Sequence, residues 1–161
     1  MVNLLVIAWN IRGLGRKEKS RAIKNLVATK KPGIVFLQET KLPKISLVSQ
    51  RRLSGNLLQG FCFAPAEGSA GGLLSMWDEN WFEVTSRTVN RRFIALLGKI
   101  KENQLECAFI NVYGPAANAE KRDFSKSCCL IARVWISLSV LEVISMFTCH
   151  RRRKLGIIRT C

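Results

Sequence analysis

The sequence is poor in the residues that bind transition metals or build disulfide scaffolds. It has a single histidine, His150, and none of its six cysteines forms a CxxC pair. Only Cys62 and Cys107 precede residue 128, and they lie far apart in the chain. This spacing argues against a zinc site and against a disulfide scaffold. Free thiols in a reducing compartment are the better interpretation.

Long apolar runs are also missing. Residues 128–149 are mostly apolar, but Arg133 and Glu142 interrupt them. A transmembrane helix needs ~20 apolar residues, and each charge near the bilayer centre costs roughly 2.5–3.5 kcal/mol. A membrane span followed by the basic residues 151–154 is therefore the less favoured alternative. No basic segment precedes the short apolar run at residues 4–9, so no signal peptide is expected.

Acidic residues are scarce. The chain has 11 of them against 26 basic residues, which gives a formal net charge of +15. Such a charge favours polyanionic partners, nucleic acid first and an anionic membrane surface second. After residue 124 the only acid is Glu142, and the pattern has neither clear helix caps nor turn residues. We therefore expect a change of organisation near residue 125.

The first forty residues predict a β-α-β unit. Residues 4–9 form a continuous apolar run that is typical of a strand buried on both faces. Lys17–Lys30 has an apolar helical face, and Ile34–Gln38 is a second buried strand. The crossover makes the two strands parallel neighbours. Asn10 and Glu39 follow these strands directly, so both are expected at the carboxyl edge of the sheet, where open α/β sheets bind ligands.

The following segment, up to residue 113, predicts a short helix within residues 45–53 and then a series of strands. The predicted strands are short, β-rich runs at residues 61–64, 73–77, 82–89, 93–100 and 105–113. Residues 67–72 are expected to be a flexible connection, and residues 101–104 a hairpin turn. A β-α-β start followed by antiparallel strands indicates an α/β fold with a mixed sheet.

The residues by themselves give only a weak indication of a metal site. Glu39 can supply an anionic oxygen and Asn10 a neutral one, and Mg²⁺ is bound by one or two protein oxygens plus water and substrate phosphate. A glutamate after a strand is more often a solvated loop residue, so these two residues alone do not decide the matter. Tyr113 ends a later strand and could reach the same edge.

Three motifs in order strengthen this interpretation. AWNIRGL at residues 8–14, IVFLQETK at 34–41 and NVYGP at 111–115 resemble successive motifs of the endonuclease/exonuclease/phosphatase superfamily. GGL at residues 71–73 and EKRDF at 120–124 look like the version in plant LINE-type retrotransposons. The resemblance covers nearly all of residues 3–124. It implies a two-sheet α/β sandwich that begins with the β-α-β unit and continues with mostly antiparallel strands.

The resemblance also implies roles for individual residues. Glu39 would be the metal-binding carboxylate, and Asn10 would help hold Mg²⁺ (or Mn²⁺) and its water. Tyr113 would lie beside the scissile phosphate and stabilise developing charge. Arg12 and Lys41 would contact the nucleic-acid backbone without reading its sequence. The alternatives are ordinary surface cations for Arg12 and Lys41, and a solvated hydroxyl for Tyr113.

The sequence departs from the superfamily in two motifs. A Gly-Asp-x-Asn motif and an Asp-His pair, which position and deprotonate the attacking water, do not occur. His150 follows a cysteine and precedes three arginines, so its presence is interpreted as incidental. Asp123 follows Tyr113 too closely to replace the missing aspartate. We therefore expect an incomplete sandwich over residues 1–124, with its second sheet largely absent, and an out-of-family tail over residues 125–161 that is not a domain.

These patterns predict a degenerate, truncated phosphodiesterase domain. The parent activity is Mg²⁺-dependent hydrolysis of nucleic-acid phosphodiester bonds, and the chain is expected to be weakly active or inactive. Its partner is expected to be DNA, bound without sequence preference. Two alternatives stay open: a non-catalytic, basic nucleic-acid-binding fragment, and a phosphoesterase of the same superfamily that acts on small phosphates.

Overall fold

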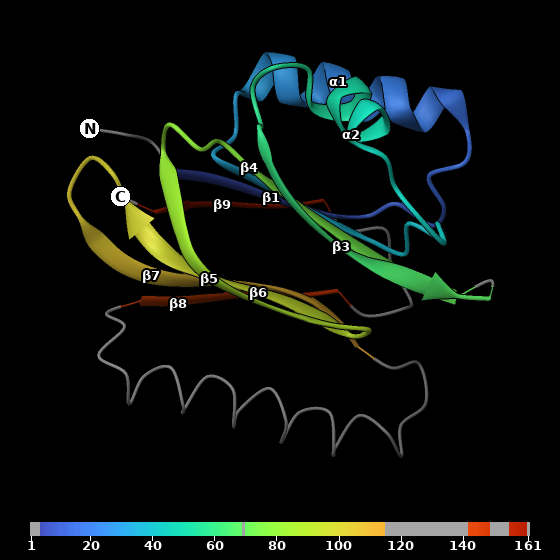
Figure 1. Cartoon of the computed structure of the whole chain (residues 1–161). Helices are drawn as coiled ribbons and strands as arrows, with labels where there is room; N and C mark the ends of the chain where they lie inside the picture. Colours follow the sequence, from blue (N-terminus) through green and yellow to red (C-terminus); the bar gives the residue numbers. More distant parts are fainter. Residues whose placement is uncertain (1–3, 69, 115–141, 149–154, 161) are drawn as a thin grey trace.

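The computed structural model describes residues 4–68, 70–114, 142–148 and 155–160. Two β-sheets lie face to face, and two helices cover the outer face of the first sheet (Figure 1). The first sheet has the strand order β3-β4-β2-β1-β9, and the second has the order β5-β6-β7-β8. The predicted fold, an α/β two-sheet sandwich that begins with a β-α-β unit and continues with mostly antiparallel strands, is confirmed.

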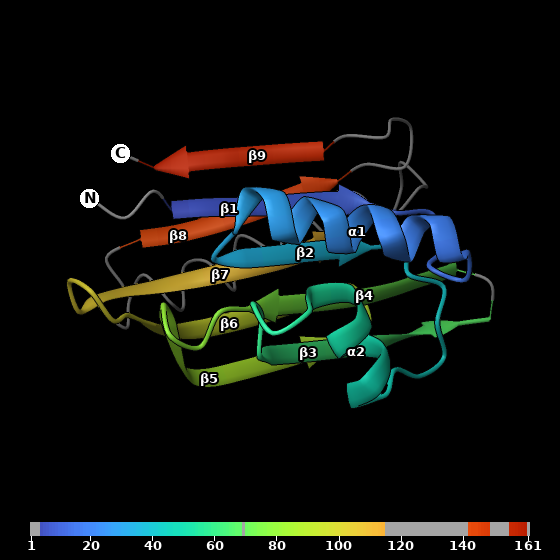
Figure 2. The ribbon, with the colours of Figure 1, turned by 90° about the horizontal axis from the view of Figure 1, so that it is seen from above.

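The predicted β-α-β unit forms the centre of the first sheet. Strands β1 (Leu4–Asn10) and β2 (Ile34–Gln38) are parallel neighbours, joined by helix α1 (Lys17–Lys30). Helix α1 ends where Lys31 adopts a left-handed conformation (φ 46°) and its N–H donates to the carbonyl of Val27. The following proline cannot continue the helix. Helix α1 lies over β1 and β2 (Figure 2).

Helix α2 (Leu47–Ser54) and the hairpin of β3 (Gly60–Glu67) and β4 (Ala70–Trp77) complete this half of the sandwich. Ser46 caps α2 by accepting a hydrogen bond from the backbone N–H of Ser49. The flexible connection expected over residues 67–72 is wrong for the strand residues within it, because Glu67 pairs with Ala70 and β4 begins there. Strand β4 then pairs antiparallel with β2.

The second sheet is better developed than the sequence suggested. Strands β5 (Phe82–Asn90), β6 (Phe93–Ile100) and β7 (Leu105–Tyr113) form an antiparallel meander. The expectation that this sheet is largely absent is therefore wrong. The physical reason is that the apolar inner face of the first sheet needs a cover, and these strands present a complementary apolar face.

Two segments after residue 125 are strands. Strand β8 (Glu142–Thr148) pairs parallel with β7, and β9 (Leu155–Thr160) pairs antiparallel with β1. The rest of the expected tail, including His150, lies outside the described residues, and so does Asp123. The domain boundary at residue 124 stays a prediction. No helix in the described ranges is long and apolar enough to cross a membrane.

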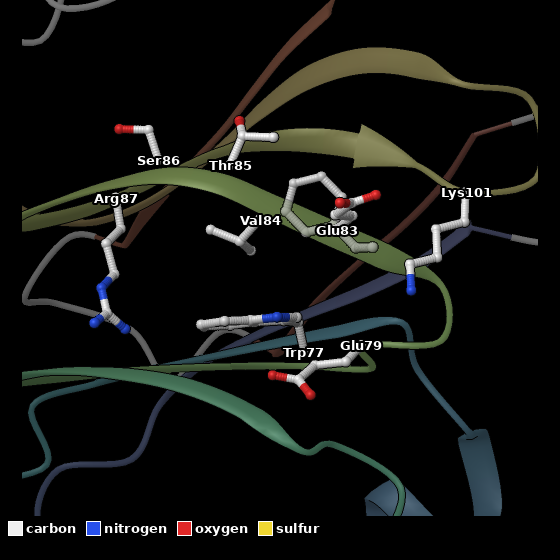
Figure 3. Close-up of a pocket in the computed structure, with 9 residues that line it drawn as sticks. Trp77, Glu79, Glu83, Val84, Thr85, Ser86, Arg87 and Lys101 are labelled. Carbon is white, nitrogen blue, oxygen red and sulfur yellow. The ribbon is translucent and has the colours of Figure 1, made fainter.

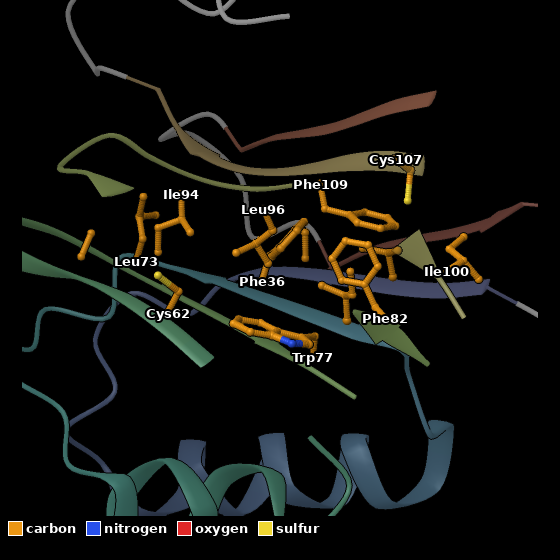
Figure 4. Packing of buried hydrophobic residues seen from close by; sticks show 14 residues of the cluster. Phe36, Cys62, Leu73, Trp77, Phe82, Ile94, Leu96, Ile100, Cys107 and Phe109 are labelled. Carbon is orange, nitrogen blue, oxygen red and sulfur yellow. The ribbon is translucent and has the colours of Figure 1, made fainter. Parts of the chain in front are cut away.

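The core consists of two layers that share the first sheet. Val6 and Ala8 of β1 pack toward the second sheet, whereas Ile7 packs toward the helices. This burial on both faces explains the continuous apolar run at the start of the chain. Between the sheets, the rings of Phe82 and Phe109 meet edge to face with their centroids 5.0 Å apart (Figure 4).

Two cysteines lie in this core. Cys62 and Cys107 are buried free thiols, so the prediction of free thiols is confirmed for these two. Burial raises the pKa of Cys62, while the nearby Arg87 acts in the opposite direction. Such a thiol is inert at neutral pH, which fits packing rather than chemistry.

Candidate functional site

The carboxyl ends of β1 and β2 are held together beyond the strands themselves. The backbone N–H of Ile11 donates to Gln38 at 2.9 Å, that of Gly13 to Glu39 at 2.6 Å and that of Leu14 to Thr40 at 2.8 Å. The two loops therefore continue the parallel pairing of the strands. This arrangement fixes the position of Glu39 relative to β1.

Glu39 is the centre of the site. Its Oε1 accepts a hydrogen bond from Asn10 Nδ2 at 3.0 Å and another from the hydroxyl of Tyr113 at 3.1 Å. Glu39 is 4% exposed and Asn10 is 1% exposed. The structure thus brings together three residues that the sequence analysis singled out, from the end of β1, the loop after β2 and the end of β7. Hydrogen bonds to a buried carboxylate are charge-assisted and hold it in one orientation.

The orientation of the Asn10 amide is set from both sides. Its Oδ1 accepts from the backbone N–H of Arg12 at 3.3 Å, and its Nδ2 donates to Glu39. A backbone N–H can only donate and a carboxylate can only accept, so both contacts require the same amide orientation. In this arrangement the Asn10 nitrogen orients Glu39, and the predicted role of the Asn10 oxygen as a metal ligand stays a prediction.

Three charged residues of the site have strained backbone conformations. Arg12 (φ 49°), Glu39 (φ 53°) and Lys41 (φ 56°) lie in the left-handed region. In the described part of the chain only Lys31 and Gln104 are further non-glycine residues of this kind. Such strain costs on the order of 1–3 kcal/mol per residue and clusters at functional sites. Its concentration in two adjoining loops marks this edge as the candidate site.

The two glycines at residues 71 and 72 support the loop after β2. The backbone N–H groups of Thr40 and Lys41 donate to the carbonyls of Gly72 and Gly71, each at 3.0 Å. Gly72 has φ 85°, and a Cβ at this position would collide with the Thr40 hydroxyl. The Gly-Gly pair of the motif at residues 71–73 therefore allows β4 to approach the loop that carries Glu39.

Lys19 is a site residue that the sequence analysis missed. Its Nζ donates to the backbone carbonyls of Ile11, Arg12 and Gly13 at 2.7, 2.8 and 2.9 Å. The signal in the sequence is a lysine in the first turn of a helix, where the helix dipole disfavours a cation.

A buried amide pair beneath the site was also missed. Gln38 Nε2 donates to Asn111 Oδ1 at 2.8 Å and so connects the two sheets. Asn111 Nδ2 in turn donates to Ser75 Oγ at 3.2 Å and to the carbonyl of Leu74 at 3.3 Å. Gln38 precedes Glu39, and Asn111 lies on the same side of β7 as Tyr113. The pair therefore fixes the distance between the carboxylate and the tyrosine.

The donor set fits a hard divalent cation with few protein ligands. Among the described residues no group of three His, Cys, Asp or Glu side chains could enclose a metal ion. A zinc or calcium site needs more ligands than that. Mg²⁺ is commonly held by one or two carboxylates, with water and substrate phosphate in the remaining positions. Glu39 at an open sheet edge fits this pattern.

Arg12 and Lys41 flank the buried carboxylate on the two loops, and both are exposed. Their positions agree with the expected approach of a phosphate backbone, although their role stays a prediction. Helices α1 and α2 add the exposed cations Lys24, Arg51 and Arg52 to the outer face of the first sheet. A polyanion near the site would therefore be attracted by the surrounding surface as well as by the loops.

A hollow of about 420 Å³ lies away from Glu39. It is lined by Trp77, Val84, Arg87 and Lys101, among others, with the indole of Trp77 facing Val84 (Figure 3). Trp77 pairs with Ile34 at the start of β2, whereas Glu39 follows the end of that strand. The part of the hollow that Trp77 lines and the candidate site thus lie at opposite ends of β2.

Comparisons with known proteins show the fold. No protein-family model and no curated protein matches the sequence. Similar solved structures include TDP2 from Caenorhabditis elegans, with 19% identity and a TM-score of 0.64. The superposition covers 91% of this chain and 47% of that one. An endonuclease/exonuclease/phosphatase from Bacteroides vulgatus has 14% identity and TM-score 0.62, with 91% of this chain and 66% of that one covered.

A third similar structure is TDP2 from D. rerio, solved in complex with a single-strand DNA product. It is 14% identical and has a TM-score of 0.60, and the superposition covers 92% of this chain and 60% of that one. The chain therefore spans between about half and two thirds of the length of these three structures. At such identities the likeness establishes the two-sheet sandwich fold.

Proposed function

We propose that the chain carries the metal-binding half of a phosphodiesterase site that acts on nucleic acid. The observation that supports this most is the convergence of Asn10 and Tyr113 on the buried carboxylate of Glu39. The three residues lie on strained loops or strand ends at one edge of the sandwich, between exposed cations. The similar structures named above include a nuclease-family protein and a complex with a DNA product.

Each residue has a distinct part in the proposed site. Glu39 would hold Mg²⁺ or Mn²⁺, which when bound supplies positive charge to a phosphate oxygen. Asn10 keeps the Glu39 carboxylate in one orientation. The Tyr113 hydroxyl donates its single O–H to Glu39 at 3.1 Å, and it would turn from Glu39 to donate to the developing charge on the phosphate. Arg12 and Lys41 would position the backbone without reading its sequence.

The proposed hydrolysis is weak or absent in this chain, which is what we expect of a degenerate or truncated derivative of the parent enzyme. The Gly-Asp-x-Asn and Asp-His motifs that would position and deprotonate the attacking water do not occur in the sequence. General-base catalysis typically contributes 10²–10⁴-fold, and it needs a base within hydrogen-bond reach of the water. Binding of metal and nucleic acid does not need that base, so it is retained in the proposal.

We further propose a plant LINE-type endonuclease domain as the parent, truncated near residue 124 and followed by out-of-family sequence. The supporting residues are the GGL motif at residues 71–73 and EKRDF at 120–124. The genomic sequence downstream of the Phe124 codon tests this proposal. A Gly-Asp-x-Asn motif in another reading frame is expected there, and its absence from all three frames would contradict the proposed parent.

A non-catalytic nucleic-acid-binding role is the second candidate, favoured by the net charge of +15. A phosphoesterase for small phosphates shares the same carboxylate, but it does not need the basic surface around the loops. A nucleic-acid-binding protein and a phosphoesterase for small phosphates differ in what they bind. Retained affinity for a DNA oligonucleotide together with no effect of inorganic phosphate as a competitor would favour nucleic acid.

A nicking assay on supercoiled DNA tests the proposed activity. With Mg²⁺ present we expect little or no nicking by the purified chain, because the water-activating groups are missing. Robust nicking that disappears in Glu39→Gln would overturn the claim of inactivity and support the metal role of Glu39. Nicking that is unaffected by Glu39→Gln, but is removed by further purification, identifies a contaminating nuclease.

A further inference from the structure

Lys19 occupies a position that does not favour a cation. It is the third residue of α1, and the partial positive charge at a helix N-terminus disfavours lysine there. The side chain is nevertheless half-buried and directed at the loop that follows β1 rather than into solvent. The contacts of its ammonium group must therefore offset the unfavourable helix dipole.

The ammonium group and the loop are matched in number and geometry. Lysine Nζ has three N–H donors, and the three acceptors are the consecutive carbonyls of Ile11, Arg12 and Gly13 at 2.7–2.9 Å. Consecutive carbonyls converge in this way because Arg12 (φ 49°) and Gly13 (φ 93°) both have left-handed backbones. Without a cation at the centre, three carbonyl dipoles of like orientation would repel one another.

The loop held by Lys19 is connected directly to the carboxylate. The backbone N–H of Arg12 donates to Asn10 Oδ1, and Asn10 Nδ2 donates to Glu39 Oε1. The N–H of Gly13 donates to the carbonyl of Glu39 at 2.6 Å. Relaxation of the strained loop would therefore release the side chain of Asn10 and the backbone of Glu39 together.

We propose that Lys19 is a positioning residue, whose ammonium group holds the loop after β1 in its strained conformation. It thereby fixes the orientation of the Glu39 carboxylate and the placement of Arg12. In this role Lys19 acts through the backbone carbonyls to which its ammonium group donates. The inference deepens the proposed function and rests on it only where Mg²⁺ is concerned; the loop geometry is independent of it.

The single tyrosine of the chain offers a direct test. Incorporation of 3-fluorotyrosine gives one ¹⁹F signal, from Tyr113, whose hydroxyl lies 3.1 Å from Glu39 Oε1. We expect Lys19→Met to shift or split this signal in the absence of metal. The matched control is Lys17→Met, which removes an exposed lysine from the same helical turn and should leave the signal unchanged.

Mg²⁺ titration of the same ¹⁹F signal provides the second measurement. Loss of a group that orients a metal ligand typically weakens affinity about 10–100-fold, so we expect a rise of that order in the Kd of Lys19→Met. In Lys19→Ala, whose short side chain leaves room for an added amine, ethylammonium supplies the missing ammonium and is expected to restore the signal of the free protein in a saturable way. Rescue by added amine would not follow from a general loss of helix stability.

The outcomes separate this inference from the proposed function. If the unmodified chain does not respond to Mg²⁺, the metal proposal fails, while the metal-free comparison of Lys19→Met with Lys17→Met still decides the role of Lys19. Identical ¹⁹F spectra for those two variants would overturn the inference. If Lys19→Met does not fold, Lys19→Gln takes its place in the same comparison, because glutamine retains two N–H donors.

Discussion

At the scale of single residues, Asn10 connects the strained loop after β1 to the carboxylate of Glu39 on the loop after β2. It is 1% exposed and uses its oxygen toward Arg12 and its nitrogen toward Glu39. A buried amide with both ends satisfied in this way has one stable orientation. Its removal would leave a backbone N–H and a carboxylate oxygen each short of one partner.

We predict that Asn10→Ala lowers the free energy of unfolding by about 1–3 kcal/mol, the usual cost of leaving a buried polar group without its partner. Urea unfolding followed by tryptophan fluorescence measures the change. Asn25→Ala is the matched control, because Asn25 is exposed on α1 and should change stability by less than about 0.5 kcal/mol. Equal effects of the two substitutions would contradict the described hydrogen bonds of Asn10.

Gly72 supports a second prediction at this scale, since it combines a left-handed backbone with a close contact to the Thr40 hydroxyl. Gly55 has a similar φ of 62°, but no atom lies within 4 Å of the place that a Cβ would occupy there. Gly55→Ala should therefore show only the conformational cost, on the order of 1–3 kcal/mol for its backbone at φ 62° and ψ −136°. Gly72→Ala should cost more and should also displace the ¹⁹F signal of Tyr113, which Gly55→Ala leaves in place. Urea unfolding and the ¹⁹F spectrum measure the two effects, and equal costs would contradict the close contact at Gly72.

At the scale of secondary-structure elements, the edges of both sheets depend on the two strands after residue 125. Strand β9 pairs with β1, and β8 pairs with β7, so each covers an edge next to a strand that carries a site residue. Unpaired strand edges present free N–H and C=O groups and favour association with other chains. The strand pairing therefore assigns β8 and β9 a stabilising role.

Deletion of residues 125–161 separates this view from that of a tail outside the fold. The strand pairing predicts a lower melting temperature and concentration-dependent association of the shortened chain. A shift of about 10 °C would correspond to several kcal/mol, since a domain of this size changes by about 2–4 °C per kcal/mol. An unchanged melting temperature with improved solubility would show instead that residues 125–161 contribute nothing to the fold. Thermal scans and light scattering at several concentrations distinguish the two.

At the scale of the whole molecule, the net charge of +15 dominates the expected association with nucleic acid. Each phosphate neutralised on duplex DNA contributes about 0.9 to the slope of log affinity against log salt. A linear plot with a slope of several units is predicted between low and moderate salt, for oligonucleotides of unrelated sequence. Affinity that does not change with salt would exclude binding through charge.

Two arginines on different parts of the sandwich, Arg12 on the loop after β1 and Arg87 on the edge strand β5, localise that binding. Arg12 lies on the loop beside Glu39, whereas Arg87 lines the distant hollow. Loss of one phosphate contact should reduce the salt slope by about 1, so Arg12→Ala is expected to do so and Arg87→Ala is not. The same slope for both variants would mean that the loops do not contact the backbone.

The sequence by itself determined the local elements and the order of the site residues. Helix α1 and strand β2 have the predicted bounds, because an apolar period and a proline after the helix are local signals. The parallel crossover placed Asn10 and Glu39 at one edge, since right-handed β-α-β connections leave few alternatives. The motif order added Tyr113, which the structure places within hydrogen-bond distance of Glu39.

Only the tertiary structure decided which strands pair across the sandwich and how the site is held. The second sheet and the pairing of β8 and β9 depend on contacts between distant segments, and short apolar runs do not specify their partners. The same is true of the Gln38–Asn111 pair and of Lys19, whose acceptors are backbone carbonyls. Backbone groups are the same in every residue, so a sequence does not show which of them converge; the folded path of the chain does.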